Sequence, residues 1–185
     1  MRSRFEMSKV LVPFCCALVV ALCACDGPMC IDRLTQPELA SAEPFTNVPD
    51  GAAIRIEGDG VPSGRIQVDL DGLESAGTVG FAVNDPWRQE QVYYSGVLLR
   101  DVLAHCVDCD SVSQLVVVGL DGYSAEIDAE VLEKWPVLLA TRCDGARMSV
   151  ACGGPTRIIL PYERYPNLAD ARTISVWNIE SVRVQ

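Results

Sequence analysis

Residues 138–162 read LLATRCDGARMSVACGGPTRIILPY and predict two buried strands joined by a glycine-rich loop. The apolar runs at 137–140 and 158–160 are typical of buried strands. Asp144-Gly145 predicts a turn, because glycine takes the positive φ that other residues resist. Cys152-Gly153-Gly154-Pro155 excludes a helix interior and allows the backbone to approach a neighbour closely.

The loop carries Arg142, Arg147 and Arg157, and guanidinium groups suit an anionic or hydrogen-bonding ligand. A tight connection between strands with solvated arginines explains the same pattern. Aromatic and acidic loop residues extend the candidate pocket, since an indole stacks on a flat heterocycle and a carboxylate accepts paired hydrogen bonds. The candidate ligand contacts are Trp87, Asp121, Tyr123, Arg142, Gly154, Pro155 and Arg157. Trp135 and Trp177 are expected in the core.

The chain has 185 residues, which is enough for one domain with a sizeable core. Its formal net charge of -10 argues against nucleic acid as a partner. His105 is the single histidine in the sequence, so a metal site with several histidine ligands cannot form and a histidine-based catalytic triad has one candidate. We therefore expect no metal site.

The N-terminus has the pattern of an export signal. Basic residues precede an apolar stretch at 10–24 that is short for a transmembrane helix. Leu22-Cys23-Ala24-Cys25 resembles a bacterial lipobox, which predicts a signal peptide at 1–24 and lipid on Cys25. An ordinary cleaved signal remains an alternative. Residues 25–51, rich in Pro, Ala, Ser and acid, predict a flexible tether, and residues 52–185 predict the folded domain.

Export places the remaining cysteines in an oxidising compartment, where pairing is expected. Cys106 and Cys109 form a CxxC motif that fits a structural disulfide, a redox pair or half of a zinc site. Cys143 and Cys152 flank the loop 144–151 and are candidates for a disulfide that fixes its shape.

The hydrophobic pattern predicts an α+β domain dominated by strands, with two or three short helices. The clearest hairpin is 114–127 around Asp121-Gly122, and the clearest amphipathic helix is 96–106. A polar loop is expected at 166–171. The expected strands are 53–57, 65–70, 78–83, 91–95, 114–118, 123–127, 137–140, 158–160, 175–179 and 181–184, and short helices are expected at 71–75 and 129–134.

Several of these segments resemble one known family. Residues 94–103, YSGVLLRDVL, are similar to the GVPLRDLL segment of sulfite-oxidase-like molybdopterin-binding domains. Asp121-Gly122-Tyr123, Ala140 to Ser149 and Gly154-Pro155 with Arg157 match further motifs in the same order, and residues 177–184 resemble its C-terminal part. The resemblance covers about 52–184 and implies the mixed fold of that family.

The resemblance also implies a limit on the chemistry. Catalytic members hold molybdenum through a cysteine in the strand and loop before the GVPL segment, and residues 79–87, VGFAVNDPW, contain none. Molybdenum chemistry is therefore not expected, because no oxygen ligand reproduces a thiolate. The chain is most similar to short exported members that keep a pterin pocket beside membrane-bound signalling proteins.

The expected function is that of a lipid-anchored, periplasmic pterin-binding sensor. Its partner would be a membrane receptor with a periplasmic domain, such as a cyclic-di-GMP enzyme or a sensor kinase, and the chain would not itself be an enzyme. Two alternatives stay open, namely a small molybdopterin-dependent oxidoreductase and a redox protein that uses Cys106 and Cys109.

Overall fold

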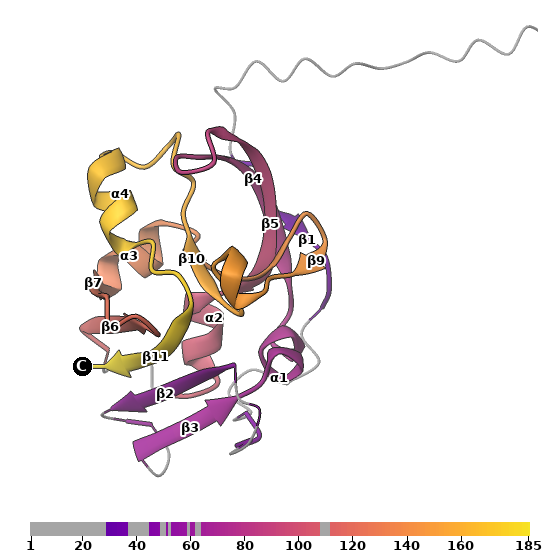
Figure 1. Cartoon of the computed structure of the whole chain (residues 1–185). Coiled ribbons are helices and arrows are strands. Elements are labelled where there is room, and N and C mark those ends of the chain that lie inside the picture. Colours follow the sequence, from indigo (N-terminus) through magenta and orange to yellow (C-terminus); the bar gives the residue numbers. More distant parts are fainter. Residues whose placement is uncertain are drawn as a thin grey trace, which may run out of the picture.

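The computed structural model describes residues 29–36, 45–48, 51, 53–58, 60–61, 64–107 and 112–185. Two sheets and four short α-helices enclose one core, as expected of a strand-dominated α+β domain (Figure 1). No helix in this part of the chain is long and apolar enough to cross a bilayer.

The first sheet has the order β1-β4-β5-β8-β10, with β9 paired to β8. All its pairings are antiparallel. Its strands are β1 (Asp32–Arg33), β4 (Val79–Asp85), β5 (Glu90–Leu98), β8 (Leu138–Cys143), β9 (Ala146–Arg147) and β10 (Arg157–Ile159). The predicted buried strands of the glycine-rich stretch are confirmed, and β8 and β10 lie side by side in register Ala140 to Arg157.

The second sheet has the order β3-β2-β11-β6-β7, and only the β2–β11 pairing is parallel. Its strands are β2 (Ile54–Gly58), β3 (Arg65–Val68), β6 (Gln114–Gly119), β7 (Ser124–Asp128) and β11 (Ile179–Val184). The predicted hairpin is confirmed, because β6 and β7 pair as antiparallel neighbours. Gly122 takes φ +83° in the turn between them, a conformation that glycine adopts readily.

The helices are α1 (Leu70–Ser75), α2 (Leu99–Ala104), α3 (Ala129–Lys134) and α4 (Leu168–Ile174). The expected loop at 166–171 is wrong, because Asn167 caps α4 through a hydrogen bond that Ala169 N–H donates to its side chain at 2.9 Å. The expected helix at 96–106 begins three residues late. Of the strand expected at 175–179, only Ile179 is in a strand, at the start of β11.

Part of the expected tether belongs to the fold. Asp32–Arg33 forms β1 on the edge of the first sheet, and Phe45 is buried in the core. Tyr93 donates a hydrogen bond to Asp32 at 2.9 Å, and Thr35 N–H donates one to the Thr78 carbonyl at 3.2 Å. The range 25–51 is therefore not wholly a linker.

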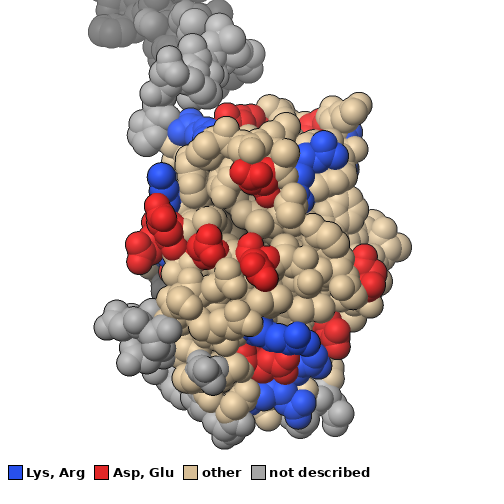
Figure 2. Space-filling view, turned by 90° about the vertical axis from the view of Figure 1, so that its left-hand side faces the viewer, with Lys and Arg blue, Asp and Glu red and all other residues tan. Residues whose placement is uncertain are grey.

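On the face shown in Figure 2, acidic and basic side chains are scattered over a surface that is mostly uncharged. At the lower end, where β2 and β3 lie in Figure 1, basic and acidic side chains interleave. Ion pairs that Glu57 makes with Arg55 at 3.1 Å and Arg183 at 2.9 Å account for part of this mixture. Exposed pairs of this kind contribute little stability.

Candidate functional site

A cavity of about 510 Å³ opens beside the loop between β8 and β10. Its lining combines positive charge, an aromatic face and sulfur. The residues that give the lining this character are Arg88, Tyr94, Cys143, Arg147, Met148, Cys152, Arg157 and Trp177. This composition suits an acceptor-rich planar ligand better than a purely apolar one.

Arg157, at the start of β10, forms the floor of the cavity and is only 2% exposed. Its Nη2 lies 3.1 Å from Asp85 Oδ2, and its Nη1 donates a hydrogen bond to the Tyr94 hydroxyl at 3.0 Å. Tyr94 in turn donates to Asp85 Oδ2 at 2.7 Å. A buried charge needs such partners, so the three residues stabilise one another.

Asp85 ends β4 and also closes the next turn. Its Oδ1 accepts hydrogen bonds from the backbone N–H of Trp87 at 2.8 Å and of Arg88 at 3.0 Å. Burial would raise the pKa of Asp85, but hydrogen bonds from Arg88 N–H and Tyr94 together with the charge of Arg157 lower it below its usual value. Burial, followed by the hydrogen bond to Asp85, raises the pKa of Tyr94. We therefore expect an ionised Asp85 beside a neutral Tyr94.

Aromatic rings enclose the guanidinium of Arg157. Its carbon lies 4.0 Å from the centroid of Trp177, 5.0 Å from that of Trp87 and 5.4 Å from that of Tyr94. Trp177 was expected in the core, but it is 36% exposed and lines the cavity. Its exposed ring offers the stacking face that the sequence assigned to Trp87.

Two donor atoms of Arg157 have no hydrogen-bond partner among the described residues. Nε and Nη2 are buried, and the contact between Nη2 and Asp85 is an ion pair without hydrogen-bond geometry. An unmade hydrogen bond on a buried charged group costs about 1–3 kcal/mol or more. Both nitrogens are shielded from solvent, so a ligand acceptor would remove that cost only after the lining moves to expose them.

The two cavity cysteines are not bonded to each other, so the expected disulfide is absent from this structure. Arg88 Nη1 donates to Cys143 Sγ at 3.2 Å, and Cys152 ends the 3-10 turn η3 (Val150–Cys152) with its side chain exposed. Burial and Asp144 raise the pKa of the Cys143 thiol, although Arg88 opposes them. Cys106 is buried, and Cys109 lies outside the described residues, which leaves the CxxC expectation untested.

Arg142 lies in a different hollow from Arg157. Successive residues of β8 point to opposite faces, so Cys143 lines the cavity while Arg142 faces a separate hollow of about 390 Å³. There Arg142 Nε and Nη2 donate to the two oxygens of Glu74 at 3.0 and 2.9 Å. Burial would raise the pKa of Glu74, but Arg142 and Thr141 lower it. Arg142 is therefore engaged in a forked ion pair.

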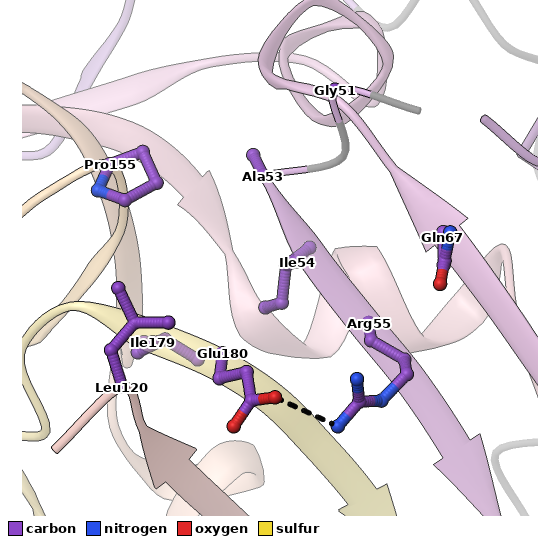
Figure 3. Close-up of a pocket in the computed structure, with 9 residues that line it drawn as sticks. All are labelled: Gly51, Ala53, Ile54, Arg55, Gln67, Leu120, Pro155, Ile179 and Glu180. Atoms are coloured by element: carbon purple, nitrogen blue, oxygen red, sulfur yellow. Dashed lines mark hydrogen bonds and ion pairs between the residues drawn. The ribbon is translucent and has the colours of Figure 1, made fainter. Parts of the chain in front are cut away.

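Three further expected contacts also lie elsewhere. Asp121 accepts from Tyr123 N–H at 2.9 Å within the hairpin turn, and the Tyr123 hydroxyl donates to the Thr173 carbonyl at 2.7 Å. Pro155 lines a third hollow of about 330 Å³, to which the first residues of β2 and β11 also contribute (Figure 3). Neither Asp121 nor Tyr123 lines the arginine cavity.

The expectation that these seven residues line one pocket is thus wrong. Trp87 and Arg157 come together, but only Arg157 lines the cavity. Gly154 does not line the cavity. Its N–H donates to the Ser149 carbonyl at 2.9 Å, and an added Cβ would lie 2.3 Å from the Met148 carbonyl oxygen. Arg88, Tyr94 and Trp177 line the cavity although no sequence pattern assigned them to it, and among the family motifs only those at 94–103 and 177–184 contain any of them.

The model of the family described as the oxidoreductase molybdopterin binding domain matches residues 72–164. The chain belongs to this family. The match includes the cavity lining that the first sheet and its loops supply up to Arg157, while Trp177 lies beyond it. No curated protein matches the sequence.

This family binds a molybdopterin cofactor, and the cavity fits the organic part of that group. Arg88, Arg147 and Arg157 would hold its ring and side-chain oxygens, and the Trp177 ring would lie against a flat heterocycle. The metal fits less well, because β4 and its following turn carry no cysteine. Cys143 and Cys152 supply the thiols in the described lining.

Proposed function

We propose that this molybdopterin-binding-domain protein binds a pterin without molybdenum and acts as an exported sensor, anchored by lipid on Cys25, for a membrane-bound signalling partner. The observation that supports pterin binding best is the buried guanidinium of Arg157. Arg157 lines a cavity of about 510 Å³, and two of its buried nitrogens have no hydrogen-bond partner among the described residues. In a pterin, N1 and O4 are acceptors for such N–H donors, whereas N3–H is itself a donor.

The sensor role rests on the sequence between β4 and β5. Residues 79–90 contain no thiol to hold molybdenum at the position where the resemblance requires one. A receptor such as a cyclic-di-GMP enzyme or a sensor kinase would then read pterin occupancy. Lipid on Cys25 would confine the domain to the membrane surface where such a receptor lies.

A small molybdopterin-dependent oxidoreductase is the second candidate, and one observation favours it. Cys143 lines the cavity and is half-buried, so a thiolate donor is present although it lies on β8. Its contact with the Arg88 guanidinium at 3.2 Å would have to be exchanged for a metal bond.

One preparation tests both candidates. The full chain is extracted from membranes, its metal content is measured by mass spectrometry, and 6-methyltetrahydropterin is titrated by calorimetry. We expect no stoichiometric molybdenum and a Kd on the order of 1 μM. Stoichiometric molybdenum would establish the oxidoreductase, and absence of both metal and pterin binding would contradict the proposal.

A matched pair of variants locates the site. Arg88 and Arg183 are both exposed arginines that pair with a glutamate, at 2.7 and 2.9 Å, but only Arg88 lines the cavity. Arg88→Gln should weaken pterin binding about tenfold, since it removes a charged hydrogen bond of about 1.5 kcal/mol. Arg183→Gln should leave the affinity unchanged.

A further inference from the structure

The cavity contains two thiols that pterin binding alone does not use. Cys143, at the end of β8, and Cys152, at the end of η3, both contribute to its lining. The two thiols differ in exposure: Cys143 is half-buried beside Arg88, and Cys152 is exposed. Because the N-terminal sequence predicts an export signal, both thiols are expected in a compartment where disulfides form.

The loop that carries Cys152 is held by its own hydrogen bonds and by hydrogen bonds from Asn178. Cys152 and Gly154 both donate their N–H to the Ser149 carbonyl at 2.9 Å. Contacts with the rest of the fold run through Asn178, whose side chain donates to the carbonyls of Val150 at 2.7 Å and Gly154 at 2.6 Å and whose N–H donates to the Gly153 carbonyl at 2.9 Å. A shift of η3 would therefore have to exchange the bonds to this one residue.

Cys143 belongs to the rigid part of the same structure. It pairs with Tyr94 across β5–β8 and with Ala146 across β8–β9. A bond between the thiols would therefore draw η3 toward β8 rather than the reverse. Such a movement would narrow the cavity above Arg157.

We propose that Cys143 and Cys152 are a reversible thiol-oxidation site whose disulfide closes the cavity. This rests on the proposed function, because it adds a redox control to the pterin pocket. The step is thiol–disulfide exchange with a protein or low-molecular-weight disulfide. The Cys152 thiolate attacks one sulfur of that disulfide and releases the other as a thiolate. The Cys143 thiolate then attacks Cys152 Sγ and releases the second thiol. The two cysteine protons go to the two released thiolates, so the co-reactant is reduced to a dithiol or two thiols.

Control of binding by the disulfide is reciprocal. If closure weakens the pterin affinity about tenfold, the ligand favours the dithiol by the same factor. A tenfold factor in a two-electron couple is about 30 mV. Saturating pterin should therefore raise the midpoint potential of the pair by about 30 mV.

The test uses the full chain equilibrated in glutathione redox buffers, trapped with a maleimide and mapped by mass spectrometry. We expect alkylated Cys143 and Cys152 under reducing conditions and one peptide pair, lighter by two hydrogens, under oxidising ones. Hydrogen exchange of amides 146–153 should slow in the oxidised form. Affinity for 6-methyltetrahydropterin should fall about tenfold in that form. Cys152→Ser should abolish this redox response, whereas Cys30→Ser, a change at an exposed cysteine outside the cavity lining, should preserve it.

Three results would overturn the proposal. Thiols that stay alkylable in the oxidising buffers, or that pair with another cysteine, would remove the site. A Cys143–Cys152 disulfide that changes neither the exchange of amides 146–153 nor the affinity would remove its control of the cavity. If the reduced chain binds no pterin, the proposed function fails, and the mapping and hydrogen exchange still decide the redox site.

Discussion

Arg157 and Asp85 determine how the cavity floor is built, because each neutralises a charge that would otherwise be buried alone. The two side chains are 2% and 1% exposed, and Tyr94 bridges them. Breaking such a pair from one side is strongly destabilising, whereas removing both charges costs less. The pair therefore explains why an arginine is tolerated at the start of a fully buried strand.

Arg157→Leu should lower the free energy of unfolding by about 3–5 kcal/mol, because it leaves Asp85 ionised and unpaired. The double variant Arg157→Leu with Asp85→Leu should be more stable than the sum of the single changes predicts. Urea denaturation measures all three. Strict additivity would show that the two side chains do not interact.

The low pKa of Asp85 predicts how stability depends on pH. A carboxyl group whose pKa is lower in the folded state stabilises the fold above its unfolded pKa of about 3.9. That contribution is lost as the pH falls from about 4 through the folded pKa. Asp85→Asn should therefore flatten the acid limb of the stability curve, measured by thermal unfolding between pH 2 and pH 7. Glu126→Gln, on the exposed face of β7, should keep the wild-type slope.

At this scale the sequence pointed to Arg157, which lines the cavity, and to Trp87, whose ring centroid lies 5.0 Å from the Arg157 guanidinium carbon. It did not show that Asp85 and Tyr94 would be its partners. Those contacts depend on which strands pair in the sheet, and the hydrophobic pattern of a sequence does not specify strand pairing. Arg142 was misassigned because the alternation of β8 reverses its face relative to Cys143.

Helices and strands were predictable where the hydrophobic residues followed a single period, either helical or alternating. The β6–β7 hairpin and α3 formed as expected, because alternation and helical spacing each persist over several residues. The boundary between β5 and α2 was not predictable. Val97 and Leu98 fit helical spacing, yet both are buried strand residues, since β5 continues beside β8 through a bulge at Gly96.

Gly96 makes that continuation possible, and substituting it should show this. A Cβ there would lie 2.2 Å from the Leu139 carbonyl, which is backbone and cannot rotate away. Gly96→Ala should therefore destabilise the fold by at least about 3 kcal/mol, as overpacking in a sheet interior does. Gly145→Ala is the matched control, because its φ is +82° but no atom lies within 4 Å of its added Cβ. It should cost only about 1–2 kcal/mol of strain. Equal losses in urea denaturation would contradict the steric account.

The strand β1 shows why the tether was overestimated. Polar composition predicted no structure, but the first-sheet edge at β4 offered backbone partners that composition cannot reveal. Thr35 and Thr78 share a hydrogen bond at 3.0 Å, and Thr78 N–H donates to Thr35 Oγ1 at 2.8 Å.

Thr35→Val should lower the stability of this edge by about 1 kcal/mol through these two bonds. Tryptic cleavage after Arg33 should then accelerate about fivefold, because cleavage follows the population of the locally open form. Mass spectrometry of the fragments measures this. Unchanged cleavage at Arg33 would mean that β1 opens by another route, and cleavage after Arg65 serves as the internal reference.

The whole molecule combines an acidic surface with an anchor that we place at the N-terminus. Removing 1–24 would leave a net charge of -12, since that segment holds three basic residues and one acidic residue. Anionic lipid repels such a surface, so the fold itself supplies no electrostatic attraction to a membrane. Membrane attachment should therefore depend on Cys25 alone. Because β1 begins at Asp32, the seven residue steps from Cys25 span at most about 25 Å.

Cys25→Ser should transfer the protein from the membrane fraction to the soluble exported fraction and abolish its labelling with palmitate. The wild type should stay with membranes in high salt, because acyl chains rather than charges would hold it. Cys23→Ser, two residues away in the same segment, is the matched control and should leave both labelling and fractionation unchanged. Soluble wild-type protein would contradict the lipid anchor. Membrane-bound but unlabelled Cys25→Ser would assign attachment to another part of the chain, and the short span to β1 would then no longer orient the cavity relative to a membrane receptor.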